Sequence, residues 1–178
     1  MSARTILIFI FCCCPPIVSA GGYKVTHLVE EKVFEGTTLL TDMSDRKRPK
    51  VVEVDFKGNV LWQYIPPWPA SGALLDAARL DNDNILITVR DSGIYEINRE
   101  RQIVWRHEDP EASHDADRLP NGNTLYNLGW QEKGEDVVRE VDSGGALVWA
   151  WNGLEDYDRE PFANIKREGW MHVNSVTR

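Results

Sequence analysis

The stretch VVEVDFKGNVLWQY, residues 51–64, decides the fold because its two short strands and the polar turn between them recur along the chain. Two further copies follow it, GIYEINRERQIVWRH at 93–107 and VVREVDSGGALVWAW at 137–151. Each copy contains a tryptophan near its end, and these are Trp62, Trp105 and Trp149. Their spacings of 43 and 44 residues indicate a structural repeat.

A second pair of strands precedes two of these copies. LDAARLDNDNILITVRD (75–91) aligns with HDADRLPNGNTLYNLG (114–129), and the alignment places Arg79 on Arg118. GTTLLTD (36–42) matches the second half of the same hairpin in the first copy. One repeat therefore consists of four short strands in a fixed order.

Four short strands in roughly 43 residues are typical of one β-propeller blade. No helical pattern separates the strands, which argues against an α/β fold. We predict an all-β fold, a β-propeller of four-stranded blades, with about three blades in residues 36–178. The repeated tryptophans are expected to fill the gaps between neighbouring blades.

A propeller usually closes with about four to eight blades. Residues 36–178 are therefore expected to be an incomplete propeller, from the N-terminal part of a longer protein. The alternative is a partial propeller that closes by oligomerising, and the sequence does not reveal the oligomeric state.

The first twenty residues, MSARTILIFIFCCCPPIVSA, have the pattern of a secretory signal peptide. An arginine precedes an apolar run, and Val18-Ser19-Ala20 resembles a cleavage site. The alternative is a signal anchor. We predict a signal peptide over 1–20, a lead-in segment over 21–35, a periplasmic or secreted protein, and no stable membrane span after cleavage.

The composition narrows the range of partners and cofactors. The chain has 20 Lys and Arg against 28 Asp and Glu, without a basic stripe, so nucleic acid is not an expected partner. All three cysteines precede residue 15, which leaves none for a disulfide or metal site after cleavage. The acidic run at 81–84 aligns with a hairpin turn and lacks the other ligands of a calcium loop. We expect neither a cofactor nor a metal.

Two histidines occupy equivalent places in the repeat. The first strand of a propeller blade lines the central channel, and the predicted first strands are 75–80, 114–119 and 172–178. They begin with Leu75, His114 and His172 respectively, so two of these positions at one channel mouth are histidine. Strand alternation is expected to place Ala116 and Arg118 on the same face as His114. Imidazole can act as nucleophile, proton donor or metal ligand, but loop backbone can also satisfy it.

These segments resemble one enzyme family. GTTLLTD, VVEVDFKGNVLWQY, HDADRLPNGNTLY (114–126) and WMHVNSV (170–176) together look like the N-terminal part of the bacterial aryl sulfotransferase family. The His-Asp motif is shared with quinoprotein-like propellers, whereas the Trp-x-His-x-Asn-Ser motif of residues 170–175 is more specific. The resemblance covers about residues 36–178.

The resemblance implies a six-bladed propeller that moves a sulfuryl group from a phenolic sulfate ester to a phenol. Channel histidines perform the transfer, so His172 and His114 become the candidate catalytic residues, and Asn174 and Arg118 the candidate substrate-binding residues. Arg118 also aligns with Arg79 in a blade without histidine, which favours a structural role. The histidine that accepts the sulfuryl group is expected in later blades, so we assign no nucleophile. The sequence does not identify the donor or the acceptor.

Two other functions remain open at this point. A non-catalytic exported propeller could bind a protein or a carbohydrate. A quinoprotein-like, PQQ-type propeller is the other alternative, because the Asp-x-x-Gly-x-x-x-Trp segment 55–62 is similar to its blades. These segments are packing motifs, however, and the sequence shows no site for the quinone.

Overall fold

The computed structural model describes residues 22–67, 73–165 and 171–177, which contain eleven strands in three antiparallel sheets. The first sheet holds β1 (Thr38–Asp42), β2 (Lys50–Val54) and β3 (Val60–Tyr64). The second holds β4 (Leu74–Arg79), β5 (Ile85–Val89), β6 (Gly93–Ile97) and β7 (Ile103–Glu108). The third holds β8 (Ala112–Arg118), β9 (Thr124–Leu128), β10 (Val138–Val141) and β11 (Leu147–Trp151). Two short helices complete the described elements, η1 (Glu30–Lys32) and α1 (Leu154–Tyr157).

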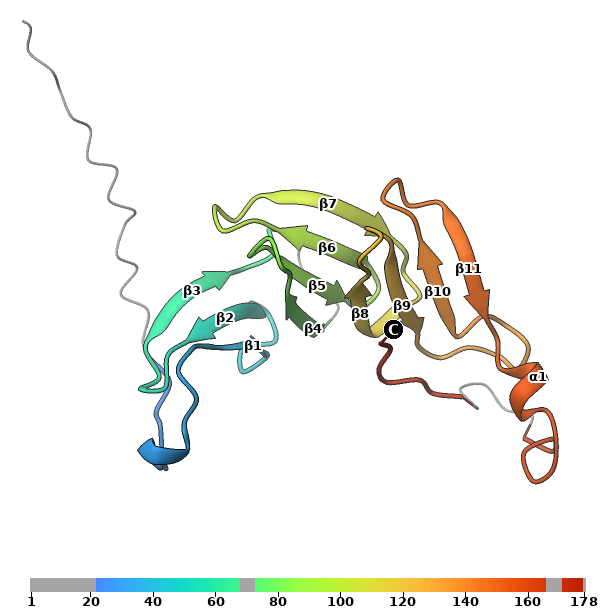
Figure 1. Cartoon of the computed structure of the whole chain (residues 1–178), viewed down its shortest axis with the longest axis horizontal. Coiled ribbons are helices and arrows are strands. Elements are labelled where there is room, and N and C mark those ends of the chain that lie inside the picture. The colour runs from blue at the N-terminus through green and yellow to red at the C-terminus, as the bar shows by residue number, and fades with distance from the viewer. Residues whose placement is uncertain (1–21, 68–72, 166–170, 178) are drawn as a thin grey trace, which may run out of the picture.

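The three sheets follow one another along an arc, as Figure 1 shows. Strands pair in chain order within each sheet, so every sheet is a meander, as in a propeller blade. The predicted all-β architecture of blade-like units is confirmed. The number of blades in a complete ring stays a prediction, as do the domain limits. The predicted signal peptide lies outside the described residues.

Tight turns join the strands of each blade. Leu119 N–H donates to Asn123 O at 2.8 Å, and Gly122 adopts a positive φ of 87° between them. The aligned turn of the second blade has Leu80 N–H donating to Asn84 O at 2.8 Å, with Asp83 in the left-handed region. The acidic run at 81–84 is therefore a hairpin turn, as predicted.

Tryptophans connect each blade to the next. Trp62 on β3 is buried, and its Nε1 donates to Arg99 O at 3.0 Å, in the β6–β7 turn. Trp105 on β7 repeats this contact, with its Nε1 2.8 Å from Ser143 O in the β10–β11 turn. The predicted packing between blades is confirmed for both tryptophans. Trp149 on β11 is 48% exposed.

The segment that carries His172 is not a strand. A strand over 172–178 was expected, but residues 172–177 adopt no regular secondary structure. Their backbone is bonded to side chains instead of to a neighbouring strand. Val176 N–H donates to Asp115 Oδ2 at 2.9 Å, and Val173 O accepts from Asn127 Nδ2 at 3.0 Å. The expectation was wrong because the described residues offer this segment no strand to pair with.

Candidate functional site

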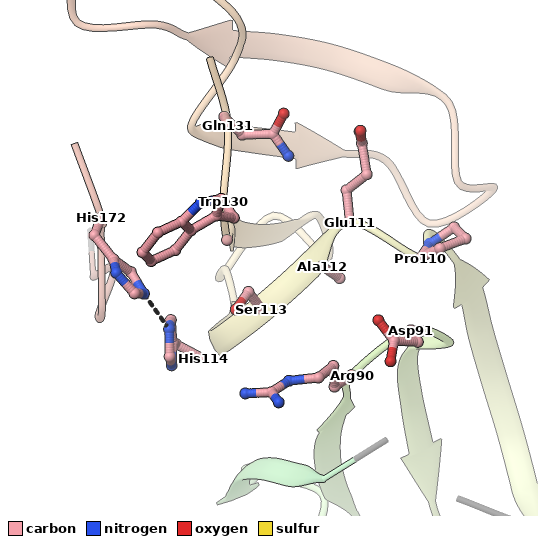
Figure 2. Close-up of a pocket in the computed structure, with 11 residues that line it drawn as sticks. Arg90, Asp91, Pro110, Glu111, Ala112, Ser113, His114, Trp130, Gln131 and His172 are labelled. Carbon is pink, nitrogen blue, oxygen red and sulfur yellow. Dashed lines mark hydrogen bonds between the residues drawn. The ribbon is translucent and has the colours of Figure 1, made fainter. Parts of the chain in front are cut away.

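A pocket of about 500 Å³ opens at one end of the inner strands. β4 and β8 are the first strands of their blades, and they contact each other. The beginning of β8 lies beside the end of β9 because the two strands are antiparallel. Six of the residues that line the pocket carry the argument below: Arg90, Glu111, Ser113, His114, Trp130 and His172. Figure 2 shows them around the same opening.

The structure brings the two predicted histidines together. His114 Nε2 and His172 Nε2 are 2.8 Å apart, and the ring centroids are separated by 4.9 Å (Figure 2). Two imidazole nitrogens at this distance share one proton, so one nitrogen donates while the other accepts. Burial lowers the pKa of His114, and the neighbouring His172 and Arg90 lower it further. The neutral form of His114 is therefore favoured, and the tautomer of each ring decides which Nε2 donates and which accepts.

A β-bulge turns His114 toward its partner. The pairing of β8 with β9 shifts between Ser113 and Ala116, and His114 has a φ of 49°. This left-handed conformation is strained for a residue other than glycine. Ala116 is buried in the apolar core between the second and third blades. The expected common face of His114, Ala116 and Arg118 is thus interrupted, because the extra residue resets the alternation.

Two polar side chains hold the His172 segment against the third blade. Asp115 accepts from Val176 N–H, and Asn127, which is fully buried, donates to Val173 O. Asn127 Oδ1 also accepts from Asp115 N–H at 3.2 Å, so one amide connects the bulge to the segment. The apolar side chains of the segment add contacts with the core of this blade; these are Met171, Val173 and Val176. The position of His172 therefore depends on the same bulge that directs His114.

Arg118 makes contacts between blades. Its Nη2 is 3.0 Å from Glu96 Oε2 in the second blade, and its guanidinium lies 4.3 Å from the ring centroid of Trp105. Arg79 forms the equivalent ion pair with Glu53, at 2.5 Å. Arg118 does not line the pocket. Its role in substrate binding stays a prediction. Its observed contacts form an ion pair between neighbouring blades, which Arg79 and Glu53 repeat.

Asn174 lies two residues beyond His172 and is exposed. Its Nδ2 donates to His172 O at 3.2 Å, which restrains the backbone that carries the imidazole. Its substrate-binding role also stays a prediction. Trp170, the first residue of the motif that includes His172, falls outside the described residues.

Sequence analysis missed two residues of the pocket, Arg90 and Trp130. Both follow the second strand of a blade. Arg90 comes directly after β5, and Trp130 is the second residue after β9. The end of a second strand faces the beginning of the first strand in each hairpin, so strand topology could have identified them. Trp130 is 60% exposed, and its ring meets that of His172 edge-on at a centroid distance of 4.9 Å.

Within the described residues, no three His, Cys, Asp or Glu side chains form a group that could hold a metal ion. Among the helices that the structure describes, none has the length and apolar character needed to cross a membrane. The pocket presents two imidazoles, a guanidinium and an indole ring, together with the carboxylates of Asp91 and Glu111.

Comparison with models of known protein families tests the resemblance that the sequence motifs suggested. The family model for arylsulfotransferase (ASST) matches residues 23–178. The chain belongs to the arylsulfotransferase family. The resemblance drawn from the sequence motifs is therefore confirmed at the level of the family.

No curated protein matches this arylsulfotransferase-family chain. Among solved structures, one similar protein is a protein of unknown function from Bacteroides caccae, with 19% sequence identity and a TM-score of 0.37. The match covers 70% of this chain and 66% of that one, so the chain spans just under two thirds of the length of that structure.

Proposed function

We propose that this arylsulfotransferase-family chain uses His114 and His172 to transfer a sulfuryl group from a phenolic sulfate ester to a phenol. The observation that carries the proposal is the 2.8 Å contact between the two Nε2 atoms at the opening of a pocket. A proton donor beside the pocket would assist the departure of a phenolate. The match to the family supplies the reaction class.

The histidine pair supplies a proton in the first half of the reaction. When the bond between sulfur and the ring oxygen breaks, both bonding electrons remain on that oxygen. When the histidine pair carries an additional proton, Nε2 of His172 passes that proton to the departing phenolate, and the lowered pKa of His114 disfavours charge on its own ring. The sulfuryl group passes to a histidine nitrogen outside this pair, and phenol leaves.

The second half reverses the proton movement. The acceptor phenol gives its proton to His172, and its oxygen attacks sulfur as the bond between nitrogen and sulfur breaks. The product is a new aryl sulfate, and the pair regains the proton that it gave to the first phenolate. No net proton is consumed, so the same pair serves both steps.

The predicted signal peptide supports export of the protein to the periplasm or to the exterior, and we include this location in the proposal. The donor and the acceptor would then be small phenolic compounds of that compartment. N-terminal sequencing of the mature protein tests the location. A chain that begins just after Ala20 supports export with cleavage, and a chain that retains residues 1–20 contradicts it.

The reaction is tested by sulfuryl transfer from 4-nitrophenyl sulfate to phenol with the full-length protein. Absorbance reports the release of 4-nitrophenol, and chromatography detects phenyl sulfate. We expect His172→Ala to lower kcat by about 10²- to 10⁴-fold, the usual contribution of general acid–base catalysis. His27→Ala is the matched control, because His27 is exposed in the lead-in segment and is expected to leave kcat unchanged.

Full activity in His172→Ala would contradict the assignment of this residue. A folded native protein that releases no 4-nitrophenol and forms no phenyl sulfate would contradict the reaction itself. That second result would favour the alternative of an exported propeller that only binds a ligand.

A further inference from the structure

Arg90 presents a positive charge to the histidine side of the pocket. In Figure 2 its guanidinium extends toward that side, and its charge contributes to the lowered pKa of His114. No carboxylate within the described residues forms an ion pair with Arg90, in contrast to Arg79 and Arg118, which each pair with a glutamate. Glu111, an acidic residue of the same pocket, is paired with Arg139 at 3.3 Å. Arg90 is therefore available to an anionic ligand.

Trp130 presents an aromatic surface to the same space. Its ring is 60% exposed, although large aromatic side chains are usually well buried. The edge-on contact with His172 holds the indole beside the histidine pair. An exposed ring in a pocket wall can pack against an aromatic ligand, because aromatic pairs attract each other beyond the burial of their area.

We propose that Arg90 and Trp130 form a two-part binding site for an aryl sulfo anion, with the sulfo oxygens on Arg90 and the aryl ring against Trp130. The planar guanidinium can donate two parallel hydrogen bonds to an oxyanion. A cavity of about 500 Å³ has the size of a typical small-molecule site. The histidine pair lies beside both residues, so a ligand held in this way has its sulfur next to the shared proton.

This inference deepens the proposed function and rests on it for the identity of the substrate. Binding can be measured separately from transfer, however, because benzenesulfonate has the ring and the sulfo group but no ester oxygen to release. Isothermal titration calorimetry of the full-length protein with benzenesulfonate therefore tests the site even if no reaction occurs.

The two halves of the site are separated by a second probe, inorganic sulfate, which has no ring. We expect Arg90→Gln to weaken the binding of both benzenesulfonate and sulfate by about 10- to 100-fold, since hydrogen bonds to charged groups are stronger than those between neutral groups. Trp130→Ala is expected to weaken the binding of benzenesulfonate by about fivefold and to leave that of sulfate unchanged. Trp130→Phe should restore most of the affinity for benzenesulfonate.

Matched controls lie on the outer strands. Arg106→Gln removes an exposed arginine from β7, and Trp149→Ala removes a half-exposed tryptophan from β11. Both are expected to bind the two probes as the native protein does. Circular dichroism melting confirms that each variant is folded, and Arg90→Lys replaces Arg90→Gln if the latter does not fold.

The inference is overturned if the native protein does not bind benzenesulfonate, or if Arg90→Gln and Trp130→Ala bind it as tightly as the native protein. Failure of the proposed function gives a different result. The native protein would then bind benzenesulfonate through Arg90 and Trp130 but would transfer no sulfuryl group from 4-nitrophenyl sulfate.

Discussion

The inner strands of the second and third blades, β4 and β8, have aligned sequences but different tasks. Arg79 and Arg118 occupy the same place in the two strands, and each pairs with a buried glutamate of the preceding blade. At the beginnings of the strands the residues differ, with Leu75 in β4 and His114 in β8. Side chains that join blades therefore repeat, whereas those around the pocket do not.

The β-bulges near the beginnings of β4 and β8 also differ. The pairing of β4 with β5 shifts between Leu74 and Asp76, so one residue is unpaired, whereas β8 leaves two residues unpaired between Ser113 and Ala116. The additional unpaired residue allows His114 to turn out of the sheet toward His172. Backbone strain at an otherwise regular strand is commonly associated with function, and here it accompanies the histidine contact.

The largest effect on stability is expected at the repeated ion pair between blades, here Arg118 with Glu96. Glu96→Ala leaves the guanidinium of Arg118, which is only 16% exposed, without its carboxylate. Removing one partner of a buried ion pair costs about 3 kcal/mol or more, so the free energy of unfolding should fall by roughly this amount. Urea denaturation measures the loss.

Glu108→Ala is the control for this variant, because Glu108 forms an exposed pair with Arg106. Its free energy of unfolding should change by about 0.5 kcal/mol or less. Equal losses in the free energy of unfolding for Glu96→Ala and Glu108→Ala would contradict the structural role of the ion pair between blades.

A smaller effect is expected at Asp76, which aligns with Asp115 on the neighbouring inner strand. Burial and the charge of Asp115 raise the pKa of Asp76 to about 6. When the pKa of a carboxyl group is higher in the folded than in the unfolded protein, the protein loses stability as the pH rises from the unfolded pKa to the folded pKa. The native protein should therefore lose stability from about pH 4 to pH 6 at this group.

Asp76→Asn removes that titration. At pH 7.5 we expect the variant to be about 1–2 kcal/mol more stable than the native protein, a value reduced for the partial exposure of the group. At pH 3.5 the gain should disappear, because the native carboxyl group is then protonated in both states. Urea denaturation at the two pH values measures the difference, with the exposed turn variant Asp81→Asn as control. A gain that is equal at both pH values would contradict the assigned cause.

The repeat made most of the fold predictable. Periodic tryptophans, alternating strands and polar turns depend on local sequence, and the structure places the blades where these features predict them. The aligned positions of His114 and His172 predicted that both lie at one end of the inner strands, but they did not predict the contact between the two rings. The bulge could not be predicted in the same way. The φ of 49° at His114 accompanies contacts of the bulge with Asn127 and with the distant segment that carries His172. Arg90 and Trp130 were not predicted, because they follow the second strands and lie outside the aligned beginnings of the first strands.

The most direct test of the histidine pair is a double-mutant cycle on the rate of transfer from 4-nitrophenyl sulfate to phenol, with His114→Ala, His172→Ala and the double variant. Two residues that share one proton act as a unit, so their effects should not add. We predict that each single variant loses at least about 10²-fold in kcat and that the double variant loses little more. Losses that multiply in the double variant, or a single variant with the native rate, would contradict the account.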